Sequence, residues 1–274
     1  MTSREWLTTI TPASGASANL REMWHERELL AFLAHRDISV RYKQTVLGAA
    51  WAFLQPLLTA VVFSIFFGRL AAMPSDGVPY SLFSYAGLLV WTFFSSSVSQ
   101  GAMSLVNSTS LFTKVFFPRL FIPLASIATA GLDFLVAAVP RAVMMAWHGW
   151  APPLQMVLLP AVLVFALVAA VGVSVFLAAL AVRYRDVRYV VPFGLQLLLF
   201  LSPIAYPSSI VPGRWRWLWA LNPMVGVVES FRWTVLGTPI DWRIVVPGVV
   251  SGVVALWAGL SYFRRVESSF ADVA

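Results

Sequence analysis

The sequence contains no cysteine among its 274 residues, and lysine and histidine are rare. Without cysteine, the chain forms no disulfide, thiolate nucleophile, iron–sulfur cluster or cysteine–zinc site. Neither of its two lysines, Lys43 and Lys114, follows a glycine, as the Gly-Lys pair of a phosphate-binding loop requires. His25, His35 and His148 lack the three- or four-residue spacing that places two metal ligands on one helical face. From these absences we predict that this chain contains neither a metal site nor a nucleotide-binding site.

Charge is also scarce, because only 11% of the residues are charged against roughly a quarter in an ordinary soluble domain. The hydrophobic set makes up 59%, and the mean hydropathy of +0.79 comes from several blocks near the roughly 20 residues that a bilayer-crossing helix needs. The scattered acids Asp76, Glu229 and Asp241 form no evident carboxylate pair, and no Gly-x-Ser-x-Gly elbow is present. We therefore predict an all-α integral membrane protein and no catalytic residue.

The apolar blocks and the polar stretches between them predict the domain organisation. Residues 1–18 are expected to be a flexible cytoplasmic leader, and residues 19–46 an interfacial segment with a helix over 19–36, capped by Asn19 and Glu22. The transmembrane domain covers residues 47–264, and residues 265–274 form a cytoplasmic tail. Six spans are predicted, at 47–70, 81–104, 119–145, 154–182, 190–205 and 243–263.

The fifth predicted span is short, and an apolar, Trp-rich stretch follows it. Pro212, Gly213, Asn222 and Pro223 interrupt this stretch. Helix breaks at membrane depth are tolerated where protein or cavity water satisfies the backbone. We interpret residues 206–237 as re-entrant half-helices on the external side; the alternative is a long loop with an interfacial helix.

Positive charge predicts the orientation, since cytoplasmic loops carry an excess of Lys and Arg. With a cytoplasmic N-terminus, thirteen of the nineteen Lys and Arg residues fall on that side. Both termini are then cytoplasmic. We interpret these residues as topology determinants and partners of lipid headgroups rather than as a nucleic-acid surface.

Four charged residues lie in or near the apolar blocks, where charge is costly. Asp133 and Arg141, eight residues apart in the third span, are predicted to form a structural pair or to line a water cavity, the alternative being a proton relay. Glu229 and Arg232, three residues apart, are predicted to pair on one helix surface, either fixing that helix or lining a pathway.

Two cytoplasmic loops combine basic and apolar side chains. The loop at 107–119 carries Leu111, Phe112 and Phe116, which are unfavourable in water unless they dock into a partner or the interface. The turn at 183–189 is strongly basic, and its alternative interpretation is a positive-inside anchor.

Several stretches also carry the pattern of a known family. They are Arg36–Trp51 with Gln55-Pro56-Leu57, the Lys114–Arg119 loop, the Arg183–Arg188 turn, Ser202-Pro203-Ile204 and Leu221-Asn222-Pro223-Met224. Together and in this order they resemble the permease subunits of ABC-2 type polysaccharide exporters, which include O-antigen, capsule and teichoic acid permeases.

The resemblance implies a homodimer, each copy bound by a separate cytosolic ATPase that holds the ATP and magnesium, so that this chain carries no cofactor. It would move a lipid-linked, O-antigen-like polysaccharide out across the inner membrane. The residues implied in coupling to the ATPase are Leu111, Phe112, Lys114, Phe116, Arg185 and Asp186. Those implied at the external gate are Tyr206, Asn222, Pro223, Glu229 and Arg232.

Such a pathway needs aromatic faces on which sugars stack and only weak hydrogen bonding. The candidates in the first two spans are Phe53, Phe63, Tyr85 and Trp91. The diphosphate of the lipid carrier would meet the cations Arg36, Arg41 and Lys43, which alternatively serve as topology anchors.

Alternatives remain open at this stage. Teichoic acid, capsule and lipo-oligosaccharide permeases share these features. An ion-coupled transporter would depend on Asp133, Arg141 and Glu229, and an intramembrane transferase would need clustered acids that the sequence lacks.

Overall fold

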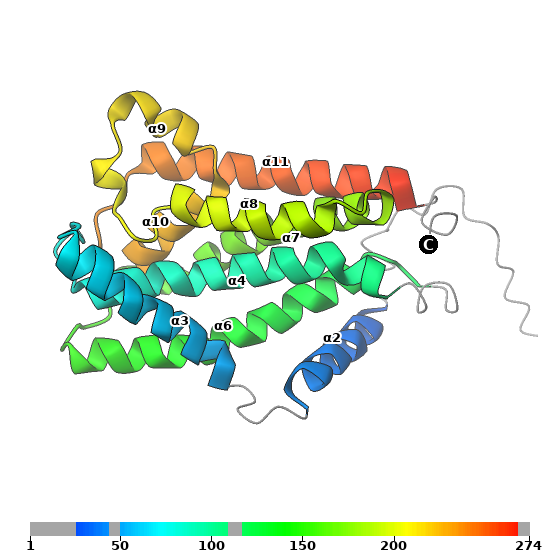
Figure 1. The fold of residues 1–274 in the computed structure, drawn as a ribbon, viewed down its shortest axis with the longest axis horizontal. Coiled ribbons are helices and arrows are strands. Elements are labelled where there is room, and N and C mark those ends of the chain that lie inside the picture. The colour runs from blue at the N-terminus through cyan, green and yellow to red at the C-terminus, as the bar shows by residue number, and fades with distance from the viewer. Residues whose placement is uncertain (1–25, 44–49, 109–116, 268–274) are drawn as a thin grey trace, which may run out of the picture.

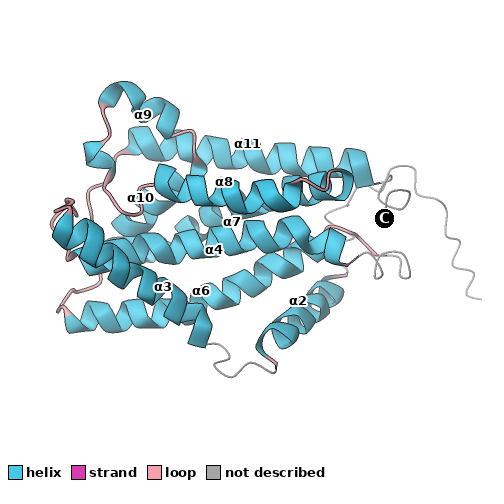
Figure 2. Cartoon of the chain, in the orientation of Figure 1, coloured by secondary structure: helices cyan, strands magenta, loops and turns pink. Residues whose placement is uncertain are grey.

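The computed structural model describes residues 26–43, 50–108 and 117–267, and all regular structure in these ranges is helical (Figure 2). The elements in chain order are α2 (Arg27–Tyr42), α3 (Ala50–Phe63), the π-helix η1 (Ser64–Leu70), α4 (Tyr80–Asn107), α6 (Phe121–Trp147), the 3₁₀-helix η2 (Leu154–Leu158), α7 (Leu159–Arg183), α8 (Val187–Leu201), the 3₁₀-helix η3 (Ser208–Ile210), α9 (Gly213–Trp219), α10 (Pro223–Leu236) and α11 (Trp242–Val266).

Five of these segments are long and apolar enough to cross a bilayer. They are Ala50–Leu70, Tyr80–Asn107, Phe121–Trp147, Leu154–Arg183 and Trp242–Val266. The sequence predicted each of them to within three residues at either end. The fifth predicted span, 190–205, corresponds to the shorter α8. This helix stops at Leu201 because Ser202 is extended before Pro203, as residues preceding proline tend to be.

Helix α4 forms the centre of the bundle, in contact with α3, α6, α7, α8 and α10 (Figure 1). Buried residues make up 78% of its apolar stretch, against 11% for Ala50–Leu70. Small side chains let α7 approach closely: the Ser174 hydroxyl donates to the Ser97 carbonyl at 3.0 Å, and a Cβ on Gly101 would lie 2.8 Å from that of Ser174. We call the end of the bundle where α4 and α11 begin and α6 and α8 end the α9 end, since α9 lies there (Figure 1).

Helices α7 and α11 also pack with glycine at the contact. A Cβ on Gly259 would lie 2.3 Å from the Gly172 carbonyl oxygen, and one on Gly172 would lie 2.4 Å from the Leu256 nitrogen. Nearer the α9 end, Gly248 of α11 faces Gly226 of α10. The backbones of these helices therefore touch directly, as small residues permit in membrane proteins.

The N-terminal helix predicted over 19–36 corresponds to α2, which runs from Arg27 to Tyr42 and so ends six residues later than predicted, and which packs against α6. The predicted caps Asn19 and Glu22 lie outside the described residues. Leu33 of α2 is buried in a cluster with Phe117 just before α6, Phe121 at the start of α6 and Phe263 of α11. Helix α2 is therefore attached to the bundle, as its broad apolar side indicated.

Candidate functional site

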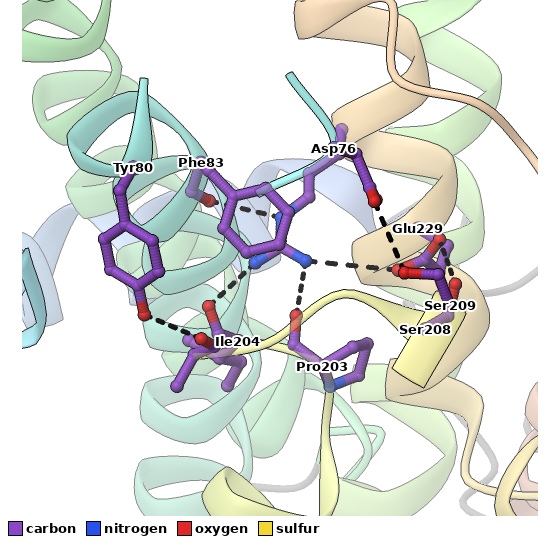
Figure 3. A network of polar contacts seen from close by, with 10 residues as sticks. Asp76, Tyr80, Phe83, Pro203, Ile204, Ser208, Ser209 and Glu229 are labelled. Atoms are coloured by element: carbon purple, nitrogen blue, oxygen red, sulfur yellow. Dashed lines mark hydrogen bonds and ion pairs between the residues drawn. The ribbon is translucent and has the colours of Figure 1, made fainter. Parts of the chain in front are cut away.

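Arg232 of α10 is the centre of a polar network at the α9 end. Figure 3 labels its partners Phe83, Pro203, Ile204 and Glu229. The Arg232 side chain is only 2% exposed. The guanidinium donates from Nε to the Phe83 carbonyl at 3.2 Å, from Nη2 to the Ile204 carbonyl at 2.8 Å and from Nη1 to the Pro203 carbonyl. It also lies 3.5 Å from the centroid of the Phe83 ring, at cation–π distance. One side chain thus connects α10, α4 and the segment after α8.

Glu229, one turn earlier on α10, extends this network. Its Oε1 lies 4.0 Å from Arg232 Nη1, so the two predicted partners do pair, at the outer limit of an ion pair. Its Oε2 accepts a 2.9 Å hydrogen bond from Ser208, and the neighbouring Ser209 donates to Asp76 at 3.3 Å (Figure 3). The segment after α8 is therefore held from two sides, by α10 and by the loop before α4.

Asn222 and Pro223 begin helix α10. The Asn222 Oδ1 accepts from the Met224 backbone nitrogen at 3.0 Å, an N-cap, and its Nδ2 donates to the Ser202 hydroxyl at 3.0 Å. Pro223 occupies the first turn, where its missing N–H costs nothing. The helix ends at Gly237, whose φ of 73° suits glycine. The helix break that the sequence indicated at Asn222 and Pro223 is therefore the ordered start of α10.

Tyr206 and Trp219 stack beside this network, with ring centroids 6.3 Å apart and an interplanar angle of 28°. The Tyr206 hydroxyl donates to the Phe200 carbonyl at 2.9 Å, and the Trp219 indole donates to the Leu201 carbonyl at 2.6 Å. These bonds satisfy carbonyls at the C-terminal end of α8, which lack helical partners. Tyr206 and the stretch Ser202-Pro203-Ile204 were singled out from the sequence, but Trp219 and Ser208 were not. The only sequence signal of these two residues is a polar group close to helix-breaking residues.

Asp133 of α6 is paired with helix α2. Its Oδ2 lies 2.8 Å from Arg41 Nη2, and its Oδ1 accepts from the Tyr42 hydroxyl. Arg41 also donates to Gln100 of α4 at 2.9 Å. Burial, reinforced by the hydrogen bond to Asp133, raises the pKa of Tyr42 to about 12, so this hydroxyl remains a donor at neutral pH.

The predicted pair of Asp133 with Arg141 is therefore wrong. Eight helical residues rise about 12 Å, which is too far for an ion pair on one helix. Arg141 is buried, its Nη1 lies 3.7 Å from Met145 Sδ, and its Nε has no hydrogen-bond acceptor among the described atoms. The sequence placed both charges in one helix but did not reveal that α2 supplies the partner of one of them.

The other two predicted headgroup cations lie near the end of α2. Arg36 pairs with the adjacent Asp37 at 2.8 Å, and Lys43 is exposed. Together with Arg41 they form a basic group at the C-terminal half of α2, in which two of the three charges have an acidic neighbour.

The four predicted conduit aromatics are placed differently. Tyr85 is fully buried and donates to the Ala137 carbonyl at 2.7 Å, and Trp91 packs on Phe94 with ring centroids 5.8 Å apart. This placement favours a core role for both. Phe53 and Phe63 of α3 are only half-buried. They remain candidates for a surface that meets sugar.

The predicted coupling residues fall into two groups. Leu111, Phe112, Lys114 and Phe116 lie outside the described residues. Arg185 and Asp186 form an exposed turn between α7 and α8, where the Arg185 carbonyl accepts from Arg188 Nε at 3.2 Å. This turn lies at the end of the bundle opposite α9 (Figure 1). Within the described ranges, no three His, Asp or Glu side chains gather as a metal site would require.

The sequence of this chain is similar to those of several known membrane transport proteins. The family described as ABC-2 type transporter matches residues 28–236. The chain is similar to the O-antigen export system permease protein RfbA of Klebsiella pneumoniae, with 27% identity over 90% of this chain and 95% of that protein. It is 30% identical to RfbA of Myxococcus xanthus over 92% of this chain and 98% of that protein. It is also 25% identical to the polysialic acid transport protein KpsM of Escherichia coli, over 85% and 92% of the two chains.

Proposed function

The chain belongs to the ABC-2 type transporter family, and from this premise we propose that it is the transmembrane subunit of an ATP-driven polysaccharide exporter of the inner membrane. The observation that carries the proposal is the near full-length similarity to relatives named as O-antigen permeases, together with a bundle of apolar helices. We further propose a lipid-linked, O-antigen-like substrate. The alternative is a polymer of the polysialic acid type, which the name of KpsM indicates for that relative.

We propose that energy comes from two copies of a separate cytosolic ATPase, which bind the ATP and magnesium, acting on two copies of this chain. The absence of a Gly-Lys phosphate loop supports this division of labour. The ATPase would contact Leu111, Phe112, Lys114 and Phe116, and the exposed turn with Arg185 and Asp186 supports a second contact at the same end.

Six spans and two cytoplasmic termini are part of this proposal. Helix α8 would be the fifth span, and α9 and α10 would be the re-entrant pair. The position of both helices at the α9 end, with α10 packed on α4, α7 and α11, supports a fold that enters from one side (Figure 1). The α9 end is then external, and the Arg232 network holds the gate segment there.

The export reaction tests the proposal directly. In proteoliposomes that contain this chain and its ATPase, we expect glycan movement to need MgATP and to fall at least tenfold without it, because the chain has no nucleotide site of its own. An ionophore should leave transport unchanged. Replacing both Leu111 and Phe112 with Asp should abolish copurification of the ATPase, whereas Arg214→Gln on external α9 should not. ATP-independent transport that an ionophore stops would contradict the proposal and favour an ion-coupled carrier.

The lipid-diphosphate role of Arg41 needs a variant that separates it from the structural pairing with Asp133. Arg41→Gln alone leaves a buried carboxylate without its cation, whereas Arg41→Gln with Asp133→Asn removes both charges. We expect the double variant to keep the melting temperature of Asp133→Asn but to lower export about tenfold, since one charge-assisted phosphate contact is lost. Asp133→Asn should export normally. Full export by the double variant would restrict Arg41 to a structural role.

A further inference from the structure

A groove of about 270 Å³ runs between α3 with η1, α4 and α6. One wall consists of Leu57, Ala60, Val61, Ser64 and Ile65. The spacing of these residues places them on one face of a helix. Ser81 of α4 and Met144 of α6 form the opposite walls, and Arg69 of η1 completes the lining.

The groove has the length and polarity gradient of one bilayer leaflet. From Leu57 to Arg69 the helix rises about 18 Å, close to half of the roughly 30 Å hydrocarbon core. Its lining is apolar except for the two serine hydroxyls and Arg69, which lies one residue before the end of the Ala50–Leu70 span at the α9 end. The apolar lining of the groove therefore lies at the depth of the hydrocarbon core, and the positive charge of Arg69 lies at the depth of the lipid headgroups.

Arg69 lies in the π-helix η1 and lines the groove. In η1 the backbone bonds connect residues five apart, as the 2.9 Å bond from the Ala71 nitrogen to the Phe66 carbonyl illustrates. Arg69 is five residues after Ser64, so it stands one turn above Ser64 on the same face.

Two cations near the groove, Arg69 in its lining and Arg141 on α6, have no acidic partner among the described residues. Arg69 is exposed, and Arg141, one turn before Met144 on α6, is buried with its Nε unsatisfied. The contact of Arg141 with Met145 directs the guanidinium towards the level of the groove. The acids Asp76 and Glu229 of the neighbouring network are occupied by Ser209 and Ser208.

We infer that this groove binds one phospholipid of the leaflet at the α9 end, with its phosphate at Arg69 and part of one acyl chain along the Leu57–Ile65 face. The volume is slightly below the roughly 300–1,000 Å³ of ligand pockets, so one chain enters in part and the rest stays in the bilayer. A second copy fits the groove less well. The Ala50–Leu70 segment contains no acidic residue, so contact of this segment with its own copy across a two-fold axis would give Arg69 no acidic partner.

The test measures lipid retained by the full-length protein. The protein is reconstituted in phosphatidylglycerol and phosphatidylcholine, extracted in mild detergent and analysed by native mass spectrometry. We expect wild type to retain one more phosphatidylglycerol per subunit than Arg69→Gln, and about tenfold weaker retention of that lipid in the variant, since a charge-assisted contact is lost. Arg69 is exposed, so its replacement should leave the melting temperature unchanged. Arg243→Gln, an exposed arginine at the same end, is the matched control.

A second variant tests the apolar part of the groove. Val61→Trp should displace the same lipid with Arg69 in place, whereas Val250→Trp on the exposed face of α11 should not. Three results would overturn the inference. Wild type and Arg69→Gln could retain phosphatidylglycerol equally, or wild type could retain phosphatidylcholine as well as it retains phosphatidylglycerol. Inorganic phosphate could also displace the bound phosphatidylglycerol. A disulfide between copies carrying Val61→Cys, which the cysteine-free chain reports without background, would overturn it as well.

Discussion

Replacing Arg232 with methionine is expected to destabilise the fold by about 3–5 kcal/mol, the usual loss when one partner of a buried ionic network is removed. The Phe83, Pro203 and Ile204 carbonyls lose their donor, and Glu229 keeps a buried charge without its cation. Thermal melting of the purified, detergent-solubilised protein measures this loss. We expect the purification yield of Arg232→Met to be well below that of wild type.

Three further variants separate the causes of this loss. Arg232→Lys should be almost as damaging, because an ammonium group lacks the planar fork that reaches several carbonyls. Adding Glu229→Gln to Arg232→Met should recover part of the stability, since the unpaired charge is removed. Arg243→Met, at an exposed arginine, should melt like wild type. Equal melting of Arg232→Met and Arg243→Met would show that the network contributes little.

Replacing Gly259 with leucine should separate α11 from α7. Even the first carbon of the new side chain would lie 2.3 Å from the Gly172 carbonyl oxygen, which belongs to backbone and has no rotamer to change. Overpacking usually costs 1–3 kcal/mol, and a backbone clash belongs at the upper end of that range, about 3 kcal/mol. The yield and melting temperature of the purified protein measure it.

Alanine variants provide the matched comparison for this contact. Gly131→Ala in α6 meets no atom within 4 Å and should be neutral, or stabilising by up to about 1 kcal/mol because alanine favours helices. Gly259→Ala should still destabilise the protein. If both alanine variants melt alike, the α7–α11 contact is looser than the structure indicates.

Apolar length predicted five of the six expected spans to within three residues at either end, because burying a helix in lipid depends on composition. The remaining one, 190–205, met the shorter helix α8. Partners between distant segments were not predictable in this way. Asp133 pairs with Arg41, ninety-two positions earlier in the chain, and no local rule relates the two. The spacing of Glu229 and Arg232 did predict their pairing, because residues three apart share a helix face.

The surroundings of Arg232 illustrate a second limit. Its acceptors are backbone carbonyls, which every residue carries, so no residue type in the sequence marks them. Tyr85 and Trp91 illustrate a third limit. Aromatic side chains suit both a sugar pathway and a helix core, and only the packing of α4 at the centre of the bundle distinguishes the two for these residues.

If α8 is the fifth span, as proposed, its shortness has a consequence for the surrounding bilayer. Its 15 residues rise about 22 Å, several ångströms less than the roughly 30 Å of hydrocarbon in a typical membrane. Val190, Phe193 and Leu197 are exposed along it, so lipid in contact with them would have to thin to avoid a hydrophobic mismatch. A polar headgroup that crosses beside α8 then meets a narrower dielectric barrier than it would anywhere along α4, α6 or α7.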